Sequence, residues 1–164
     1  MSMKKTTVLG FLTFALLGTQ AQAVTLTELI TEAEKFGKVS AGMFTQQGVI
    51  LKGELLEKGD VGTNNCLIMI EKVGDRFAIM DYDAATVAGA TTASLSDFQN
   101  NMSRDQKSLD IRQRLDGDST IRTVAKISGD RFLTIQQKWH DSAYFFGIPA
   151  AQKSYTCVVD LKNQ

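Results

Sequence analysis

The stretch Gly74-Asp75-Arg76-Phe77 returns as Gly129-Asp130-Arg131-Phe132, fifty-five positions further along the chain. Apolar runs flank both copies. Gly and Asp favour tight turns, and a turn between two apolar runs is typical of a β-hairpin. The motif therefore predicts two hairpin corners, in which Gly and Asp form the turn, Arg begins the outgoing strand in solvent, and Phe is the first ring of the core. A matched pair of anion sites on Arg76 and Arg131 is the alternative.

The same spacing relates longer segments of the chain. A shift of fifty-five residues moves the segment 66–73 onto 121–128. It also moves 49–56 onto 104–111, which overlaps a strand expected over 109–115. Two tandem three-stranded units are one interpretation of this pattern, and chance recurrence of a favourable turn sequence is the other.

The N-terminal residues have the three parts of a secretory signal peptide. Lys4-Lys5 precede an apolar run over 6–18, and Ala21-Gln22-Ala23 supplies small residues for cleavage. The run is shorter than the roughly 20 apolar residues that cross a bilayer. We therefore expect residues 1–23 to be removed. Residues 24–164 should then form one domain in the periplasm or outside the cell, with no membrane span.

The charge balance argues against nucleic acid as a partner. The full chain has 18 Lys and Arg against 18 Asp and Glu, and residues 1–23 contain two Lys and no acid, so 16 basic residues face 18 acidic ones after cleavage. The basic cluster from Arg104 to Arg114 is interleaved with Asp105 and Asp110. Binding to a phosphate backbone requires clustered positive charge, which this pattern does not provide.

Cys66 and Cys157 are the only cysteines. In an exported protein two cysteines favour a disulfide, and here it would join the last strand to an early one. A redox or nucleophilic thiol is the alternative, but it would require a CxxC pair or a nearby base, and the sequence around either cysteine has neither.

The periodicity of apolar residues predicts the remaining elements. A capping box at Thr25-Leu26-Thr27-Glu28, with apolar residues at helical spacing up to Phe36, predicts an amphipathic helix over 25–37. The small residues of 84–96 predict a loop, with a short helix capped by Ser94 after it. Strands are expected at 49–56, 66–73, 76–82, 109–115, 121–127, 132–139 and 153–161. The predicted fold class is α+β, with the N-terminal helix packed on an antiparallel meander of about seven strands.

No catalytic or metal-binding motif is present. His140 is the only histidine, and GxSxG, HExxH and CxxC patterns are missing. The run Trp139-His140-Asp141-Ser142 places an acid, a base and a hydroxyl in sequence, but neighbours on an extended segment point to opposite faces. Asp81-Tyr82-Asp83 and Asp116-Gly117-Asp118 are typical of strand ends and turns rather than of calcium ligands. We assign no catalytic residue, metal or cofactor.

The most informative segment for function runs from Trp139 to Pro149. It contains the only Trp, His and Pro of the chain and three consecutive aromatic residues. Three adjacent rings cannot all face one core, so a loop here would present some of them to a ligand or a protein. The candidate binding residues are Trp139, His140, Tyr144, Phe145 and Phe146. The alternative is that these rings pack beneath the loop as a satellite of the core.

These features favour a small exported binding or inhibitory module that acts on an unidentified protein or small-molecule ligand of the cell envelope. Ser128-Gly129-Asp130-Arg131-Phe132 is similar to the SGxxY signature of periplasmic lysozyme inhibitors, with Phe132 in place of Tyr. This resemblance covers five residues and implies that the ligand is an enzyme. A small hydrolase that uses His140, and an envelope component that self-associates through sheet edges, are the other hypotheses.

Overall fold

The structure is a computed structural model that describes residues 23–57, 65–82, 90–115, 119–145 and 148–164. The predicted signal peptide lies outside these ranges, apart from Ala23. In the described ranges, none of the helices has the length and apolar character required to span a bilayer.

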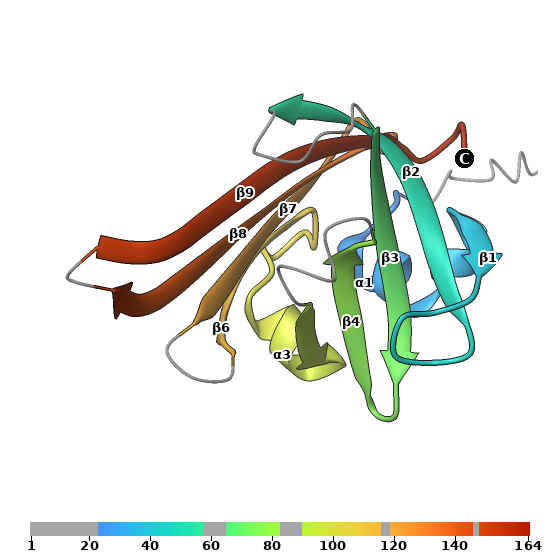
Figure 1. The fold of residues 1–164 in the computed structure, drawn as a ribbon. Coiled ribbons are helices and arrows are strands. Elements are labelled where there is room, and N and C mark those ends of the chain that lie inside the picture. Colours follow the sequence, from blue (N-terminus) through green and yellow to red (C-terminus); the bar gives the residue numbers. More distant parts are fainter. Residues whose placement is uncertain (1–22, 58–64, 83–89, 116–118, 146–147) are drawn as a thin grey trace, which may run out of the picture.

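An antiparallel sheet of nine strands curls on itself until it is nearly closed (Figure 1). Its order is β5-β4-β3-β2-β9-β8-β7-β6, and β1 pairs with the first part of β2. The strands are β1 (Lys38–Ser40), β2 (Gly48–Glu57), β3 (Asn65–Val73), β4 (Arg76–Asp81), β5 (Thr91–Ser94), β6 (Ser108–Arg114), β7 (Thr120–Ser128), β8 (Phe132–Phe145) and β9 (Ile148–Asp160).

The strand number differs from the expected seven because two short strands were missed. β1 has three residues, and β5 lies inside the segment 84–96 that was expected to be a loop. The small side chains of β5 gave no alternating apolar signal, but Thr91 and Ala93 are buried because β5 pairs with β4. The part of that segment over 84–89 lies outside the described residues. The short helix capped by Ser94 is confirmed as α3 (Leu95–Asn100).

The N-terminal helical segment is shorter than expected. Thr25 Oγ1 accepts the Glu28 N–H at 3.2 Å, as the capping box requires. Helix α1 (Leu26–Thr31) nevertheless has six residues, and a 3₁₀ turn (Ala33–Lys35) follows it. The prediction of one continuous helix over 25–37 is therefore wrong. The Thr31 hydroxyl donates to the Thr27 carbonyl at 2.9 Å where α1 ends, and such bonds destabilise and bend helices.

Both copies of the Gly-Asp-Arg-Phe motif are hairpin corners, but the corners differ by one residue. Val73 pairs with Arg76 in the first corner, whereas Ser128 pairs with Phe132 in the second. One added residue reverses the face on which every following side chain lies. Phe77 packs against the core, as predicted, but Phe132 is 41% exposed, so its assignment to the core is wrong.

The core lies mainly inside the curled sheet. Leu26, Leu29 and Ile30 of α1 pack there against both halves of the sheet, together with Phe98 of α3. β3 and β4 are buried on both faces, because a second cluster around Met69 and Met80 lies on their outer side. The continuous apolar run of β3 is therefore covered on both faces, and α1 covers only one of them.

The predicted disulfide between Cys66 and Cys157 is confirmed. It connects β3 to β9, which are the two neighbours of β2 in the sheet. The bond passes close to Gly53 of β2, where an added Cβ would lie 2.6 Å from Cys157 Sγ and 2.8 Å from Cys66 Sγ. Glycine at this position therefore makes room for the bond. A disulfide is consistent with an oxidising, exported compartment.

Candidate functional site

The aromatic segment is part of a long hairpin and not the loop that was expected. The β7–β8 ladder ends where Thr120 pairs with His140, while β8 and β9 remain paired as far as Phe145 and Ile148. Figure 1 shows this hairpin continuing past the ends of β6 and β7. We name the two-stranded part beyond His140, formed by 141–145 and 148–151, the β8–β9 arm. The high β-propensity of aromatic residues explains why this segment forms strands.

The candidate binding residues are distributed along this hairpin. Trp139 and His140 are half-buried at the base of the arm, where Trp139 is in register with Ile121 and Lys153. Tyr144 and Phe145 belong to the arm itself, in register with Pro149 and Ile148. Phe146 lies outside the described residues. Four of the five candidates therefore lie on β8. Trp139 and His140 are at the base of the arm, and Tyr144 and Phe145 are in the arm.

His140 shows no catalytic arrangement in the described part of the chain. It lies in an extended strand, in register with Thr120 on one side and Gln152 on the other. Asp141 follows His140 on β8, and the β8–β9 register shifts between Asp141 and Tyr144, so adjacency in sequence does not establish a catalytic group. Among the described residues, no group of three or more His, Cys, Asp or Glu is positioned to hold a metal ion.

A buried polar cluster lies inside the sheet, next to the base of the arm. The cluster consists of Asp81, Thr91, Thr123, Gln137 and Tyr155, which come from five strands and are at most 4% exposed. Gln137 Nε2 donates to Thr123 Oγ1 at 2.8 Å and to the Ile79 carbonyl at 3.1 Å. The Thr91 and Thr123 hydroxyls lie 2.6 Å apart, and the Tyr155 hydroxyl donates to Gln137 Oε1.

The cluster is an internally satisfied network rather than an open ligand site. No buried side-chain nitrogen or oxygen of the described residues lacks a hydrogen-bond partner. Burial, together with the nearby charge of Asp81, raises the pKa of Tyr155 well above its usual value, so its hydroxyl keeps the proton that it donates. Satisfied buried networks make a fold rigid and specific. Trp139 is two residues beyond Gln137 on β8 and hence on the same face, so the cluster lies next to the base of the arm.

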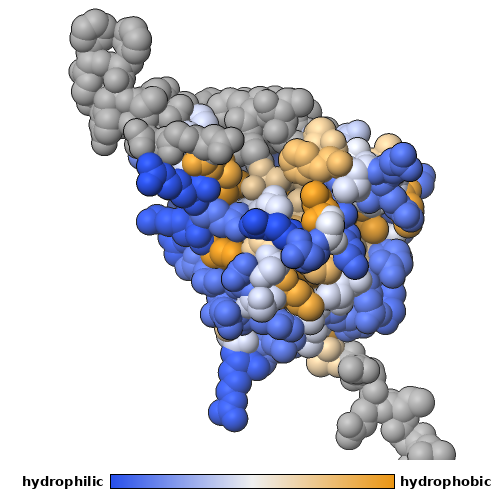
Figure 2. Space-filling model, turned by 90° about the horizontal axis from the view of Figure 1, so that it is seen from below, coloured by the Kyte–Doolittle hydropathy of each residue, from blue (hydrophilic) through white to orange (hydrophobic). Residues whose placement is uncertain are grey.

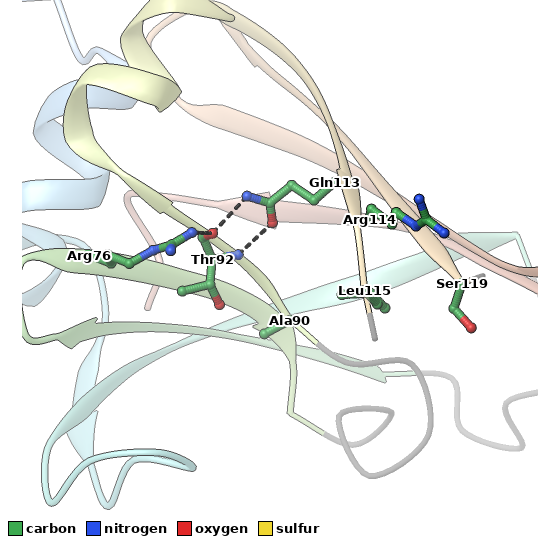
Figure 3. A pocket seen from close by; sticks show the side chains of 7 residues that line it. All are labelled: Arg76, Ala90, Thr92, Gln113, Arg114, Leu115 and Ser119. Atoms are coloured by element: carbon green, nitrogen blue, oxygen red, sulfur yellow. Dashed lines mark hydrogen bonds between the residues drawn. The ribbon is translucent and has the colours of Figure 1, made fainter. Parts of the chain in front are cut away.

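The two ends of the sheet meet at a seam between β5 and β6. In Figure 3, the Gln113 carboxamide spans this seam and binds both backbone groups of Thr92. Gln113 Nε2 donates to the Thr92 carbonyl at 2.7 Å, and Gln113 Oε1 accepts the Thr92 N–H at 2.8 Å. A hollow of about 510 Å³ lies beside the seam, and Arg76 and Arg114 line part of it. Arg76 donates to the same Thr92 carbonyl at 2.5 Å.

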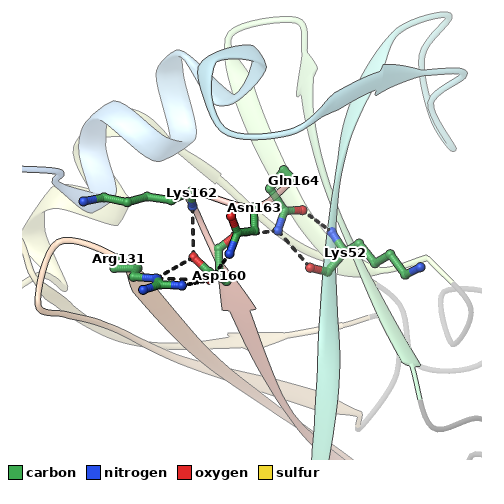
Figure 4. Close-up of polar contacts among 6 residues, drawn as sticks. All are labelled: Lys52, Arg131, Asp160, Lys162, Asn163 and Gln164. Atoms are coloured by element: carbon green, nitrogen blue, oxygen red, sulfur yellow. Dashed lines mark hydrogen bonds and ion pairs between the residues drawn. The ribbon is translucent and has the colours of Figure 1, made fainter.

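The arginine of the second corner has a different role. Arg131 forms a two-point ion pair with Asp160, with Nε at 3.0 Å from Oδ1 and a terminal nitrogen at 2.6 Å from Oδ2 (Figure 4). Its guanidinium carbon lies 4.9 Å from the centre of the Phe132 ring. Because Arg76 binds a backbone carbonyl and Arg131 binds a carboxylate, the two corners do not form a matched pair of anion sites.

Residues 162–164 are fixed by hydrogen bonds to Asp160 and to Lys52. Lys162 N–H and Asn163 Nδ2 also donate to the Asp160 carboxylate. The Gln164 carboxamide binds the N–H of Lys52 at 2.6 Å and its carbonyl at 3.0 Å (Figure 4). This contact occupies β2 between its pairing with β1 and its pairing with β9.

Sequence reasoning missed the polar cluster and both glutamine contacts. A signal for the cluster does exist, because Thr123 and Gln137 interrupt strand faces that are otherwise apolar. Nothing local in the sequence distinguishes Gln113 or Gln164 from a solvated surface residue. Their partners are 21 and 112 positions away, respectively.

Comparison with protein-family models, curated proteins and solved structures finds no match to this chain. The similarity of Ser128–Phe132 to the lysozyme-inhibitor signature therefore receives no support from a wider likeness. The functional argument depends on the geometry described above.

Proposed function

We propose that this protein is a small exported binding or inhibitory module that engages a protein or small-molecule ligand through the β8–β9 arm. The observation that carries the proposal is the continuation of β8 and β9, paired with each other, beyond the last residue that β7 pairs with. From Asp141 to Phe145 this ladder has no third strand among the described residues.

The composition of the arm supports a role in binding. An isolated two-stranded ribbon is only marginally stable in water and usually requires a further strand or a covering layer. The arm carries Tyr144 and Phe145, and rigid aromatic side chains are enriched at binding interfaces. A ligand that covers the arm would supply the missing layer.

The base of the arm supports the same proposal. Gln137 and Tyr155 face each other across β8 and β9 and are fixed in the buried polar cluster, two residues from Trp139 on β8 and two residues from Lys153 on β9. An arm that projects from a rigid base loses less conformational entropy when it binds. A hydrolase that uses His140 is less well supported, because the part of the chain that the structure describes gives His140 no partner arrangement suited to catalysis.

The proposal is tested by combining Tyr144→Ser with Phe145→Ser. Capture of a ligand from envelope extract should fall to background, while the melting temperature stays within about 2 °C of the parent value, since the proposal places these two rings against the ligand rather than in the core. Leu56→Ser is the matched control, because Leu56 is 64% exposed on β2 and distant from the arm in sequence. The control should capture as well as the parent chain.

Two results would contradict the proposal. A large loss of stability in the arm variant would support rings that pack as a satellite of the core. Light scattering that detects an oligomer in the parent chain and a monomer in the arm variant would support self-association. His140→Ala tests the hydrolase hypothesis, since an enzyme that uses His140 would lose its activity in this variant.

A further inference from the structure

Basic side chains concentrate on the outer face of β6, β7 and β8. Alternate residues of these strands are buried inside the sheet, among them Leu109, Thr123 and Ile135, so the residues between them lie on the outer face. In the described strands, as far as His140 on β8, the outward positions hold one acid, Asp110, and five basic residues: Arg112, Arg114, Arg122, Lys126 and Lys138. We name these six charged residues the basic face.

Three of the cations lie side by side across the strands. Arg112 is in register with Arg122, and Arg122 is in register with Lys138. Residues directly opposite on neighbouring strands have Cβ atoms about 5 Å apart, and like charges at such positions destabilise a sheet. This row therefore lowers the stability of the fold, and an anionic surface bound over it would remove the repulsion.

Asp110 neutralises only one cation of the row. Arg122 Nε donates to Asp110 Oδ1 at 2.8 Å, and a terminal nitrogen of Arg122 lies 2.5 Å from Oδ2. Hydrogen bonding to Arg122, with a smaller contribution from the charge of Arg112, lowers the pKa of Asp110, so this carboxylate is ionised at neutral pH. With five cations and one anion, the basic face keeps a net charge of +4.

The basic face adjoins the β8–β9 arm. Lys138 is two residues before His140, where the β7–β8 ladder ends and the arm begins. Figure 1 shows β6, β7 and β8 side by side, with the arm continuing from β8. One partner can therefore contact the arm and the basic face together.

From these observations we propose that the partner of the arm is a protein with an acidic surface beside its contact with the arm, and that the basic face binds this surface. The inference rests on the function proposed for the arm and narrows its ligand to a protein. Guanidinium groups bind carboxylates through two parallel hydrogen bonds, and three of the five cations are arginines. Complementary charge of this kind steers association and fixes the orientation of the partner.

The size of the basic face explains why it acts together with the arm. Four alternate positions along three strands, which lie about 4.8 Å apart, cover roughly 300 Å². Each partner in a standard protein interface contributes about 800 Å², so the face requires the adjoining arm to reach that size. The underside of the molecule offers no substitute, because its apolar patches are small and separated by hydrophilic side chains (Figure 2).

The charge on the rest of the chain favours a partner of limited extent over an anionic bilayer. Residues 24–164 contain 16 basic and 18 acidic residues, so subtracting the five cations and one acid of the basic face leaves 11 basic against 17 acidic residues elsewhere. A bilayer or a long polyanion extends past the face and repels acidic regions within about 10 Å, the Debye length at 0.1 M salt. An acidic patch on a protein attracts the face without this repulsion.

The experiment reverses charge on the basic face. Arg112→Glu combined with Lys138→Glu is compared with Lys38→Glu combined with Lys72→Glu, which changes the net charge equally at exposed residues of β1 and β3. The probe is the protein species that the parent captures from envelope extract and the Tyr144→Ser/Phe145→Ser arm variant does not. This species is purified, and its association with each immobilised chain is measured.

Association kinetics give the expected result. At about 20 mM salt the association rate constant should fall about tenfold or more in the basic-face variant, and by about twofold or less in the control. Raising the salt to about 200 mM should slow association with the parent and leave the basic-face variant nearly unchanged, because salt screens the charges that steer the partner.

Thermal stability separates binding from a structural role. Both substitutions on the basic face place a carboxylate opposite Arg122, so the melting temperature should stay within about 2 °C of the parent value or rise. If the row served only the fold, the variant would lose stability together with affinity.

Several results would overturn the proposal. It fails if the arm-dependent species associates with the basic-face variant as fast as with the parent, or if the control slows as much. It also fails if the parent forms an oligomer that the basic-face variant does not, or if phosphatidylglycerol–phosphatidylethanolamine vesicles bind the parent and not that variant. If no captured species depends on the arm, both proposals fail, whereas an arm-dependent species that is indifferent to the basic face overturns this inference alone.

Discussion

The side chains of Gln113 and Gln164 each form the backbone hydrogen bonds that a neighbouring strand would otherwise form. Each side chain binds both the N–H and the carbonyl of one backbone residue, Thr92 for Gln113 and Lys52 for Gln164. A primary carboxamide presents the same donor and acceptor as a peptide unit, so it satisfies an edge residue as a neighbouring strand would. These contacts satisfy backbone groups at two places where the ladder between strands is interrupted. Gln113 lies in β6 and Gln164 follows β9, and no local residue pattern predicts either contact.

Asp160 gives a prediction at the residue scale. Hydrogen bonds from Arg131 lower the pKa of Asp160 from 3.8 to about 2. A lowered folded-state pKa stabilises the fold while the carboxyl is ionised, so this contribution is complete above about pH 4 and is lost as the pH falls toward 2. Asp160→Asn should therefore have a melting temperature that depends less on pH between 4 and 2, as measured by circular dichroism. Asp75→Asn, at the first corner, should retain the slope of the parent chain. Equal slopes for the parent and Asp160→Asn would contradict the assignment.

At the scale of elements, the sequence predicts strands well where apolar residues alternate over a long segment. β2, β3, β4, β6 and β7 lie within one or two residues of their expected bounds. Predictions failed where a local signal was weak or had two meanings. β1 and β5 are short, α1 ends at Thr31 rather than near Gly37, and the unusual composition of Trp139–Pro149 was interpreted as a loop although aromatic residues also favour strands.

The fifty-five-residue recurrence relates two strands to each other, but it does not extend to the strands that follow them. β3 (Asn65–Val73) and β7 (Thr120–Ser128) are offset by this distance at both ends, and each precedes a hairpin corner. The corners themselves differ in length, so the residues after them lie on different faces. Sequence identity over four residues determines that a turn forms, but pairing on both sides determines the register.

Glycine substitutions test two roles of glycine in these elements: the positive φ at the hairpin corners and the space beside the disulfide at Gly53. Gly74 has φ +65° and no heavy atom within 4 Å of an added Cβ, so Gly74→Ala should cost about 1 kcal/mol of unfolding free energy from backbone strain alone. Gly53→Ala should cost considerably more, because its Cβ would lie 2.6 Å from Cys157 Sγ and from the Val158 carbonyl. Urea unfolding of both variants, with Gly129→Ala (φ +58°) as a second corner, measures the difference. Equal losses at Gly74 and Gly53 would show that the space around Gly53 adapts.

At the scale of the whole molecule, the sheet consists of two antiparallel meanders, β2 to β5 and β6 to β9. The disulfide could be predicted because only two cysteines are present. The polar cluster could not be predicted from local pattern, because it assembles side chains from five strands that belong to both meanders. Sites of this kind depend on contacts between residues distant in sequence, such as Ile79 and Gln137.

The junction between the meanders gives the last prediction. β2 and β9 join them through a short ladder from Gly53 to Glu57 that contains a register shift, and the disulfide connects strands on either side of β2. Cys66 and Cys157 are 91 residues apart, so replacing both with Ala should lower the unfolding free energy by about 3–5 kcal/mol. Reductant should lower the denaturation midpoint of the parent chain to that of the variant and leave the variant unchanged.

Hydrogen exchange should accelerate most at the β2–β9 ladder and least at the longer β7–β8 ladder, because the bond restrains the first and does not cross the second. Uniform acceleration in both ladders would instead indicate that the disulfide stabilises the whole fold without a specific role at the junction.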